Sequence, residues 1–426
     1  MSRRALFIAV LVLGCAAAAQ AGDFEHSPRF LGLADTGNAA FNPTNMPPVF
    51  ENIATAADPS KFYIGGESRS VNYFGFGSED DVDYNMLLVR GGASIKSFYP
   101  FGEDDDDDWT GRFGLLVAPG VAADVLRVRI NDDDTELELT DLRVVTSPAI
   151  RMGLAYGFHE AFAAGLGFTM YPSAAHANQF EGTQNTPDGS DNADFQDNWV
   201  ISGPFAFTPE VGFLWRTNTG MQFGLAYEMG YFAKRETSVE HQTKDGDFDY
   251  DTEVAVVKPH NLGLGWAYKI DDIDDFYVSA DLDLYFRQTY EGDTYDVRRG
   301  RDYYVRSAVP VKDDPTTWSN EPLDPNRHKI GEKFYASTNN RYILSAAVEK
   351  AFETVSLRGG MGYQVENGLD RDRPLSSFFT TVGPTLLFDE AIYMAAAGRF
   401  DIGFAGGETT YLVLGTGGSL MLGGTF

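Results

Sequence analysis

Cysteine is almost absent from this sequence: Cys15 is the only one in 426 residues. It lies within residues 1–21, where two early arginines, an apolar run over 5–13 and an Ala-Gln-Ala site at 19–21 predict a cleaved secretory signal. The mature chain would then have no disulfide and no thiolate chemistry, and the protein leaves the cytoplasm. The alternative is a lipoprotein signal, in which Cys15 is lipidated and retained.

A long apolar run is also missing. After residue 21, no stretch reaches the roughly 18 to 20 consecutive apolar residues that a membrane-spanning helix needs. A membrane protein without such helices must close a sheet on itself, because an open sheet edge in lipid is prohibitively costly. The alternatives are therefore a closed barrel or a secreted soluble β-protein, and the absence of any linker favours one large unit.

Basic residues are scarce beside acidic ones. The chain has 33 Lys and Arg against 62 Asp and Glu, a formal net charge of -29, which disfavours nucleic acid as a partner. The acidic runs at 104–108 and 132–134 could hold Ca²⁺, but neither has the spaced ligands of an EF-hand loop. The six histidines show no zinc-ligand spacing and no Gly-x-Ser-x-Gly elbow occurs, so we expect no metal, no cofactor and no enzyme.

What the sequence does contain is alternation of apolar with polar or small residues. Residues 276–287 read FYVSADLDLYFR, which places Val278 and Leu284 on one face and Asp281 and Asp283 on the other. This period of two describes a strand and not a helix. The pattern recurs in two further segments, 221–231 and 261–270. One face is suited to contact hydrocarbon and the other is not.

Alternation and turn chemistry together predict fourteen strands. Their ranges are 61–76, 83–98, 110–127, 138–156, 161–176, 198–216, 221–238, 252–270, 276–290, 341–352, 355–366, 376–388, 391–404 and 410–426. Short connections alternate with longer polar ones, of which 177–197 and 291–340 are the longest. An even-numbered antiparallel barrel with short periplasmic turns and long outer loops is typical of the bacterial outer membrane.

Aromatic residues and the last residue support the same prediction. Outward positions near strand ends are aromatic, as in the interfacial girdles of membrane proteins; they are Phe162, Trp215, Tyr227, Tyr231, Tyr268 and Tyr363. The final strand ends in Phe426, and a terminal aromatic residue resembles the sorting signal that the outer-membrane barrel assembly machinery reads. We therefore expect a monomeric barrel among outer-membrane lipids.

Residues 22–58 do not alternate and are rich in Ala, Gly, Asn and Pro. A structureless lead-in of this length is unusual unless something holds it, and its small residues permit tight packing. On composition alone, the segment suits either a plug inside the barrel or a flexible periplasmic tail.

Two motifs in this lead-in carry a resemblance to a known family. Residues 32–40 read GLADTGNAA and residues 49–54 read VFENIA. They are similar to the G-x-A-x-x-G-x-A-A and V-F-x-N-P-A stretches of the FadL/TodX-like outer-membrane transporters of long-chain fatty acids and other hydrophobic compounds. The resemblance implies a hatch at 22–58 inside a barrel at 59–426. The hatch residues that it implies are Gly32, Ala34, Gly37, Ala39, Ala40, Phe50, Asn52 and Ala54.

One position departs from the family pattern, because the family proline is Ile53 here. Proline fixes its own backbone angle and restricts the residue before it, so we expect the turn at Asn52 to be softer or displaced to residues 42–43. The resemblance continues through the barrel, at 110–120, 259–290 and 355–363, and covers essentially the whole mature chain.

The inward face carries charges of both signs. The inward candidates are Arg112, Arg151, Glu210, Arg216, Glu228, Lys269, Asp281, Asp283, Arg287, Glu349 and Arg358. Most are expected to pair with one another or with the hatch. Alternatively, an arginine fork receives the carboxylate of a fatty acid, and Arg151, Arg216 and Arg358 are the candidates. The inward aromatic candidates for an apolar pocket are Phe74, Tyr171 and Tyr285.

The third predicted strand contains Ala118-Pro119-Gly120. Proline cannot donate a ladder hydrogen bond and glycine tolerates bulges, so a kink or break is expected there. In the family that the chain resembles, a kink in this strand opens a lateral exit toward the membrane. These three residues are therefore the candidate lateral gate, and a strand that simply ends early is the alternative.

The prediction as a whole is an all-β, fourteen-stranded outer-membrane barrel of a Gram-negative bacterium, plugged by an N-terminal hatch. Its predicted function is passive inward transport of a hydrophobic small molecule, a fatty acid or a hydrocarbon. The alternatives are a porin for polar solutes and a structural or adhesive barrel that works through the loop at 291–340.

Overall fold

The structure is a computed structural model that describes most of the chain from residue 28 onward. The described residues are 28–42, 46–58, 61–79, 82–101, 111–132, 137–171, 176–185, 193–202, 206–243, 246–270, 273–286, 289–295, 297–298, 329–337, 340–367, 375–388, 391–405 and 410–425. The predicted signal at 1–21, the acidic run at 104–108, most of the loop at 291–340 and Phe426 lie outside these residues, so those predictions stand as predictions.

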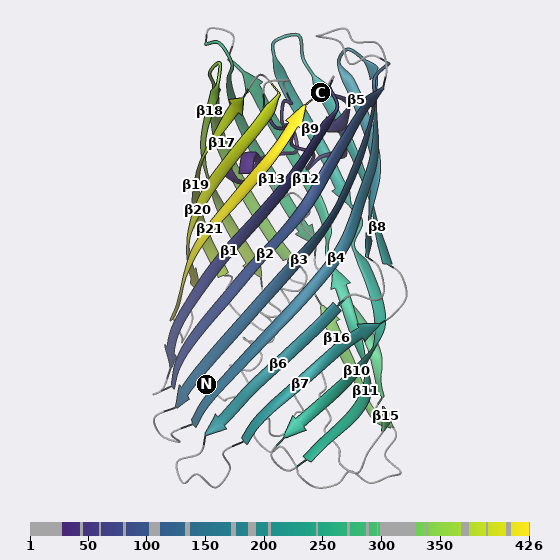
Figure 1. Cartoon of the computed structure of the whole chain (residues 1–426), viewed down its shortest axis with the longest axis vertical. Helices are drawn as coiled ribbons and strands as arrows, with labels where there is room; N and C mark the ends of the chain where they lie inside the picture. Colours follow the sequence, from purple (N-terminus) through teal and green to yellow (C-terminus); the bar gives the residue numbers. More distant parts are fainter. Residues whose placement is uncertain are drawn as a thin grey trace.

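Of the described strands, 19 form one closed antiparallel sheet, a tall cylinder of tilted strands, and the other two pair with each other (Figure 1). The strands are β1 (Tyr63–Glu79), β2 (Val82–Phe101), β3 (Phe113–Asp132), β4 (Leu137–His159), β5 (Phe162–Tyr171), β6 (His176–Asn185), β7 (Ala193–Ser202), β8 (Ala206–Arg216), β9 (Met221–Glu228), β10 (Tyr231–Thr243), β11 (Gly246–Lys258), β12 (His260–Lys269), β13 (Phe276–Phe286), β14 (Thr289–Tyr295), β15 (Val297–Arg298), β16 (Lys329–Ser337), β17 (Asn340–Ala351), β18 (Val355–Asn367), β19 (Leu375–Phe388), β20 (Ile392–Ala405) and β21 (Thr410–Thr425). The barrel closes where β1 pairs with β21, from Tyr63 opposite Thr425 to Ser78 opposite Thr410.

The sheet makes fourteen passes, and the predicted count is confirmed. Six passes are divided into shorter pieces: β5 with β6, β7 with β8, β9 with β10, β11 with β12, β13 with β14 and β15, and β16 with β17. Each piece pairs with a piece of a neighbouring pass, as β5 does with β8, β6 with β7 and β15 with β11. Among the described residues, no helix is long and apolar enough to cross a membrane.

The outer surface of the barrel is apolar. Leu166, Val382 and Leu420 are 70%, 66% and 65% exposed, respectively, and the predicted girdle residues Phe162, Trp215, Tyr227 and Tyr363 are also exposed. At the end of the barrel where the short turns lie, aromatic rings of neighbouring strands stack on the outer face, Phe162 on Trp215 and Trp215 on Phe223. A large apolar surface of this kind is stable only against another apolar phase.

One predicted side-chain direction is wrong. Phe74 was expected to face the lumen, but it is 39% exposed on the outer face, together with Ile64 and Phe76. The alternation in β1 is weak, because small and polar residues occupy both faces of this strand. Tyr285 does face inward, where the Arg341 guanidinium lies 3.8 Å from its ring centroid.

β3 runs through residues 118–120 without interruption, so the strand neither breaks nor ends early there, and the expected kink stays a prediction. The ladder to β4 is continuous here, whereas the ladder to β2 omits the two pairs of Ala118 and Pro119 and resumes in the same register. The β19–β20 ladder omits two pairs at Pro384 in the same way. Proline has no N–H to donate, so each lapse is confined to one side of its strand.

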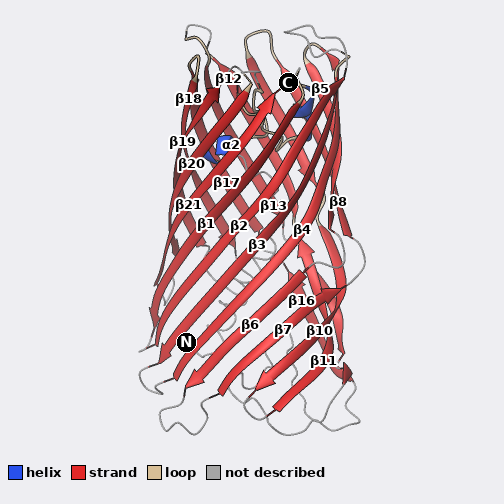
Figure 2. Cartoon of the chain, viewed as in Figure 1, coloured by secondary structure: helices blue, strands red, loops and turns tan. Residues whose placement is uncertain are grey.

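The N-terminal segment, defined here as residues 28–58, packs against the inner face of the sheet (Figure 2). It contains the helical turns α2 (Pro28–Gly32) and η1 (Ile53–Ala57). From residue 29 to 57, every described residue is buried except Asp35, Phe41 and Glu51. α2 contacts β18 to β21, whereas η1 contacts β3, β4, β5 and β8, so the segment bridges two parts of the wall.

Candidate functional site

Arg29 anchors the first half of the N-terminal segment to the wall. Its Nε and Nη2 donate to the Glu349 carboxylate of β17 at 2.8 to 3.2 Å, and both side chains are at most 2% exposed. The remaining donors bind within the segment, to Asn42 Oδ1 and to the carbonyls of Phe41 and Pro47. One guanidinium therefore fixes the fold of the segment and its position on the wall at the same time.

Asp35 makes a second charged contact. Its carboxylate binds Arg399 of β20 at 2.5 Å and Arg69 of β1 at 3.2 Å, and Arg399 is also paired with Asp401. Ala34 and Asp35 both have left-handed backbone angles, φ 53° and 61°, which cost non-glycine residues about 1 kcal/mol or more each. The two arginines hold Asp35 in this turn.

A pair of wall carboxylates receives the backbone after this turn. Gly37 N and Asn38 N both donate to Asp281 Oδ2 of β13 at 2.7 Å, and Asn38 Nδ2 donates to Asp283 Oδ1 at 2.9 Å. The alternation of FYVSADLDLYF places both aspartates on the inward face. They satisfy backbone and amide donors that burial would otherwise leave without partners.

Asn52 holds the second half of the segment. Its Oδ1 caps η1 by accepting from Ala54 N at 3.0 Å, and its Nδ2 donates to the carbonyls of Asn38, Phe213 and Leu225. The latter two belong to the wall strands β8 and β9. η1 thus begins directly after Asn52, and the side chain that caps it is also bonded to the barrel.

Ile53, which stands where the resembled family has proline, is 1% exposed and packs into a notch in the wall. A methyl group at Gly153 would lie 2.0 Å from Ile53 Cδ1, and one at Gly165 would lie 2.8 Å from Ile53 Cγ2. Phe50 stacks on Phe98 of β2 with ring centroids 5.3 Å apart. The apolar cluster around them includes Ala54, Ala56, Ala57, Tyr63, Leu116, Ala155, Ala163 and Leu214.

Glycines line the wall where the segment approaches it most closely. Gly165 is paired with Gly212 across β5 and β8, and Gly224 is paired with Gly265 across β9 and β12. A methyl group at Gly224 would lie 1.6 Å from the carbonyl oxygen of Asn38, a distance that no side chain can occupy. The absence of side chains here lets the backbone of the segment lie directly on the backbone of the wall.

At the other end of η1, Asp58 binds two further wall residues. Its carboxylate pairs with Arg216 of β8 at 2.9 Å and accepts from Asn42 N at 2.7 Å, while its carbonyl accepts from Arg112 at 3.4 Å. Asn42 also exchanges hydrogen bonds with Val49 through both side-chain atoms. The two halves of the segment are thereby tied together.

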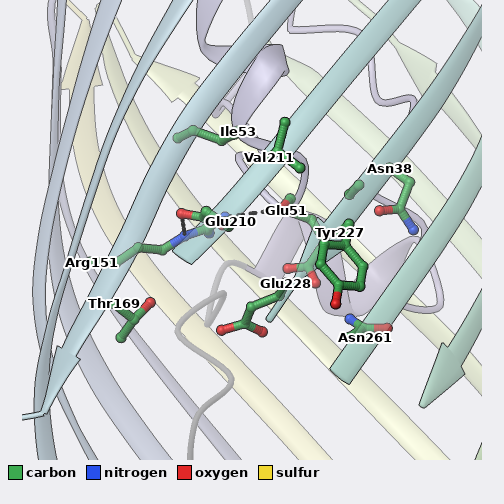
Figure 3. A pocket seen from close by; sticks show the side chains of 11 residues that line it. Asn38, Glu51, Ile53, Arg151, Thr169, Glu210, Val211, Tyr227, Glu228 and Asn261 are labelled. Atoms are coloured by element: carbon green, nitrogen blue, oxygen red, sulfur yellow. Dashed lines mark hydrogen bonds and ion pairs between the residues drawn. The ribbon is translucent and has the colours of Figure 1, made fainter. Parts of the chain in front are cut away.

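A polar cavity lies between the segment and β4, β5, β8, β9 and β12 (Figure 3). In this view Arg151 reaches toward Glu210, to which it donates at 2.6 and 2.9 Å, and its Nη2 also donates to the carbonyl of Glu51. The remaining lining residues are Asn38, Ile53, Thr169, Val211, Ala226, Tyr227, Glu228 and Asn261. The cavity has more carboxylates than cations and is not the apolar pocket expected for a fatty-acid tail.

The structure thus locates every predicted site residue that it describes. The eight predicted hatch residues, Gly32, Ala34, Gly37, Ala39, Ala40, Phe50, Asn52 and Ala54, are all buried in the segment. The head-group candidates do not converge, because Arg151, Arg216 and Arg358 are paired with Glu210, Asp58 and Glu349, respectively. Only Arg151 borders the cavity. The structure does not describe the side chain of Tyr171.

Sequence reasoning missed two features. Arg29 lies before the family motifs and was not singled out, although an arginine beside Pro28 at the start of a buried segment is a usable signal. The inward glycines were assigned to the lumen face as small residues. Their role as a contact surface depends on which strands are neighbours, and the alternation of one strand does not contain that information.

Comparison with known proteins identifies the fold. No family model matches the sequence, and no curated protein matches it. Among solved structures, a Pseudomonas aeruginosa FadL homologue matches with a TM-score of 0.59 at 12% identity, over 94% of this chain and 98% of its own. The Pseudomonas putida toluene transporter TodX matches with a TM-score of 0.57 at 10% identity, over 96% of this chain and 100% of its own.

The chain has the FadL/TodX fold. The Ralstonia pickettii toluene transporter TbuX matches as well, with a TM-score of 0.51 at 11% identity, over 95% of this chain and 99% of its own. The resemblance predicted from the sequence is confirmed for the fold. Identities this low show a shared FadL/TodX architecture and leave the transported compound to be argued from this chain.

Proposed function

We propose that this protein is a passive outer-membrane transporter of small hydrophobic molecules, either fatty acids or hydrocarbons. The observation that carries the proposal is the N-terminal segment, which is buried against two parts of the inner wall of a barrel with an apolar outer surface. The relatives in fold include a FadL homologue and two toluene transporters. In this proposal the segment, together with residues 22–27, is a hatch that rearranges to let substrate pass.

The proposed path begins at the outer loops, enters the lumen and leaves sideways near Ala118, Pro119 and Gly120. The lapse in the β2–β3 ladder at Ala118 and Pro119 supports this exit, because two strands without mutual hydrogen bonds separate more easily. Ala118 is buried on the inner face and has a small side chain, so it presents little obstruction. Within the cavity, Arg151 is the proposed contact for a carboxylate head group, which would have to displace Glu210.

The proposed location is the outer membrane of a Gram-negative bacterium, reached after removal of residues 1–21. The apolar outer surface and its aromatic residues would contact lipid, and Phe426 would be read by the barrel assembly machinery. The protein would act as a monomer, because a closed barrel leaves no sheet edge to pair with a second copy.

The hatch is testable by removal and by locking. Deleting residues 22–56 should raise the permeability of liposomes to a small sugar.

The locking test uses a disulfide. Thr36 Oγ1 and Ser279 Oγ are 2.7 Å apart, so a Thr36→Cys/Ser279→Cys pair should form a disulfide that holds the segment on β13. Oxidation should then stop uptake of a hydrophobic substrate and reduction should restore it. Equal uptake in both redox states would refute the hatch.

The lateral exit has its own test. Replacing Pro119 and Gly120 with Val and Thr should complete the β2–β3 ladder and slow hydrophobic uptake while the barrel stays folded. Pro384→Val provides the matched control, because it completes a similar lapse between β19 and β20. If both variants slow uptake equally, or neither does, the exit is not near Pro119.

A porin for polar solutes is the second candidate, and the polar lining of the cavity favours it. The same liposome experiment separates the two functions. A porin should pass small sugars at a high rate with the Cys pair oxidised, whereas a hatch-plugged transporter should not.

A further inference from the structure

Glu349 on β17 faces two arginines that bind it unequally. Arg29 of the N-terminal segment makes three hydrogen bonds to its carboxylate, at 2.8 to 3.2 Å. Arg358 of β18 lies within ion-pair distance, with Nε 3.5 Å from Glu349 Oε1, but donates no hydrogen bond to it. The closer partner belongs to the segment, and the more distant one belongs to the wall.

Arg358 is fixed in place by two hydroxyl groups, but two of its guanidinium donors have no acceptor among the described residues. Its Nη2 donates to Ser356 Oγ at 3.1 Å and to Thr385 Oγ1, whereas its buried Nε and Nη1 donate to no described residue. The side chain is 3% exposed and directly opposite Glu349 in the β17–β18 ladder. Cross-strand neighbours of opposite charge normally pair, so Arg358 has both the position and the free donors to bind Glu349.

The segment covers Arg358 while it occupies Glu349. α2 passes over the arginine at Gly32, where a methyl group would lie 2.6 Å from both Cγ and Cδ of Arg358. Seating the segment therefore removes water from Arg358, while the hydrogen bonds of Glu349 go to Arg29. Two buried donors without acceptors, beside a second guanidinium, oppose the seated state.

We propose that Arg358 is a substitute partner that takes over Glu349 when Arg29 leaves with the segment. This inference rests on the proposed function, in which the segment moves. A buried carboxylate that loses the cation hydrogen-bonded to it is strongly unfavourable, and this penalty would hold the segment in place. Because Arg358 replaces Arg29 at Glu349, the ion pair is exchanged instead of broken, and the hatch can be released reversibly.

The proposal predicts that substituting Arg29 and substituting Arg358 change the rate of segment release in opposite directions, although both arginines face Glu349. Arg29→Gln removes a bond of the seated state and should speed release. Arg358→Gln removes the partner of the released state, together with two unsatisfied donors of the seated state, and should slow release. If Arg358 only helped to pack the wall, its loss would loosen the segment as the loss of Arg29 does.

Release is measured by thiol labelling of a single Ser279→Cys, at a half-buried position that contacts Thr36 when the segment is seated. Arg29→Gln should raise the labelling rate by about tenfold, and Arg358→Gln should lower it by a factor of about three or more. Heat-dependent gel migration identifies folded barrels. Arg358→Lys keeps the charge and provides a milder variant, whose labelling rate should lie between those of Arg358→Gln and the parent. Faster labelling in both Arg358 variants than in the parent would overturn the proposal.

A second measurement tests whether Arg358 acts through Glu349. Glu349→Gln should speed labelling, because two arginines then face each other without a carboxylate. In this background no carboxylate can be exchanged, so the factor by which Arg358→Gln changes the labelling rate should differ from its factor in the parent. Additive effects would overturn the exchange. The proposed function fails separately: if deletion of residues 22–56 leaves sugar permeability unchanged, the segment is no hatch, whatever the arginines do.

Discussion

The two halves of the N-terminal segment are held by different physical means. Residues 28–42, the clamped half, bind the wall through ion pairs and hydrogen bonds, with Arg29 on Glu349 and Asp35 on Arg399 as the main contacts. Residues 46–58, the packed half, bury Ile53 and Phe50 in an apolar cluster on the wall, to which the hydrogen bonds of Asn52 and the ion pair of Asp58 are added. Both halves are almost fully buried, so the difference lies in the chemistry of the contact.

This difference predicts how much each half contributes to the free energy that holds the segment on the wall. Apolar burial is a net gain of about 25 cal/mol per Å², whereas a buried ion pair must repay the desolvation of two charges and often comes close to break-even. We therefore expect the packed half to supply most of the affinity for the wall. The clamped half would supply the register of the segment and a contact that can be exchanged.

The largest effect should come from spoiling the shape of the packed half. A methyl group at Gly114 would lie 1.8 Å from the carbonyl oxygen of Ala56, so Gly114→Ala leaves η1 no place on the wall. Sugar permeability in liposomes should rise close to that of the 22–56 deletion. Gly66→Ala is the matched control, because nothing lies within 4 Å of that position. Similar permeability in both variants would contradict the close contact.

Truncating the apolar anchor should have the next largest effect. Ile53→Ala empties the notch at Gly153 and should weaken seating by about 2 to 4 kcal/mol, the range for large-to-small changes in a core. Thiol labelling of Ser279→Cys gives the shift in the open fraction. Ile53→Val, which removes one methylene, should cost about 1 kcal/mol, and an equal effect of the two variants would argue against packing as the cause.

Breaking the ionic clamp should matter less. Arg29→Gln should weaken seating by about 1 to 2 kcal/mol, because Arg358 remains to neutralise Glu349. The same labelling assay places this variant beside Ile53→Ala. If Arg29→Gln opens the segment further than Ile53→Ala does, the division between the halves is wrong and the charges dominate.

The smallest effect is expected at a single neutral hydrogen bond of the clamped half. Thr381 Oγ1 donates to the carbonyl of Gly32 at 3.0 Å, and Thr381→Val should weaken seating by about 1 kcal/mol or less. Thr381→Ser keeps the hydroxyl and should behave like the parent in the labelling assay. An unchanged labelling rate in Thr381→Val would show that this hydrogen bond does not contribute to seating.

The barrel was predictable from sequence because its signal is local. A strand with one face in lipid and one in the lumen must alternate, and FYVSADLDLYF reveals both Asp281 and Asp283 as inward residues. The assignment failed at Phe74, because β1 places small or polar residues on both faces and its alternation does not fix the direction.

The candidate site was predictable only in part. The family motifs located the buried stretch and Asn52, which has an identifiable capping role. The partners of Arg151, Arg216 and Arg358 were not predictable, because an inward arginine has many carboxylates within reach in sequence terms and only the closed barrel selects one. Arg29 and Glu349, 320 positions apart, illustrate the same limit.

The glycine pairs that contact the segment also affect the width of the barrel lumen. Gly165 with Gly212, and Gly224 with Gly265, project nothing into the barrel, so the space vacated by a departing segment is not refilled by wall side chains. The bore of the open protein on that side would then be set by the thickness of the segment itself. A bulkier residue at Gly224 would narrow the bore even in a protein from which residues 22–56 have been deleted.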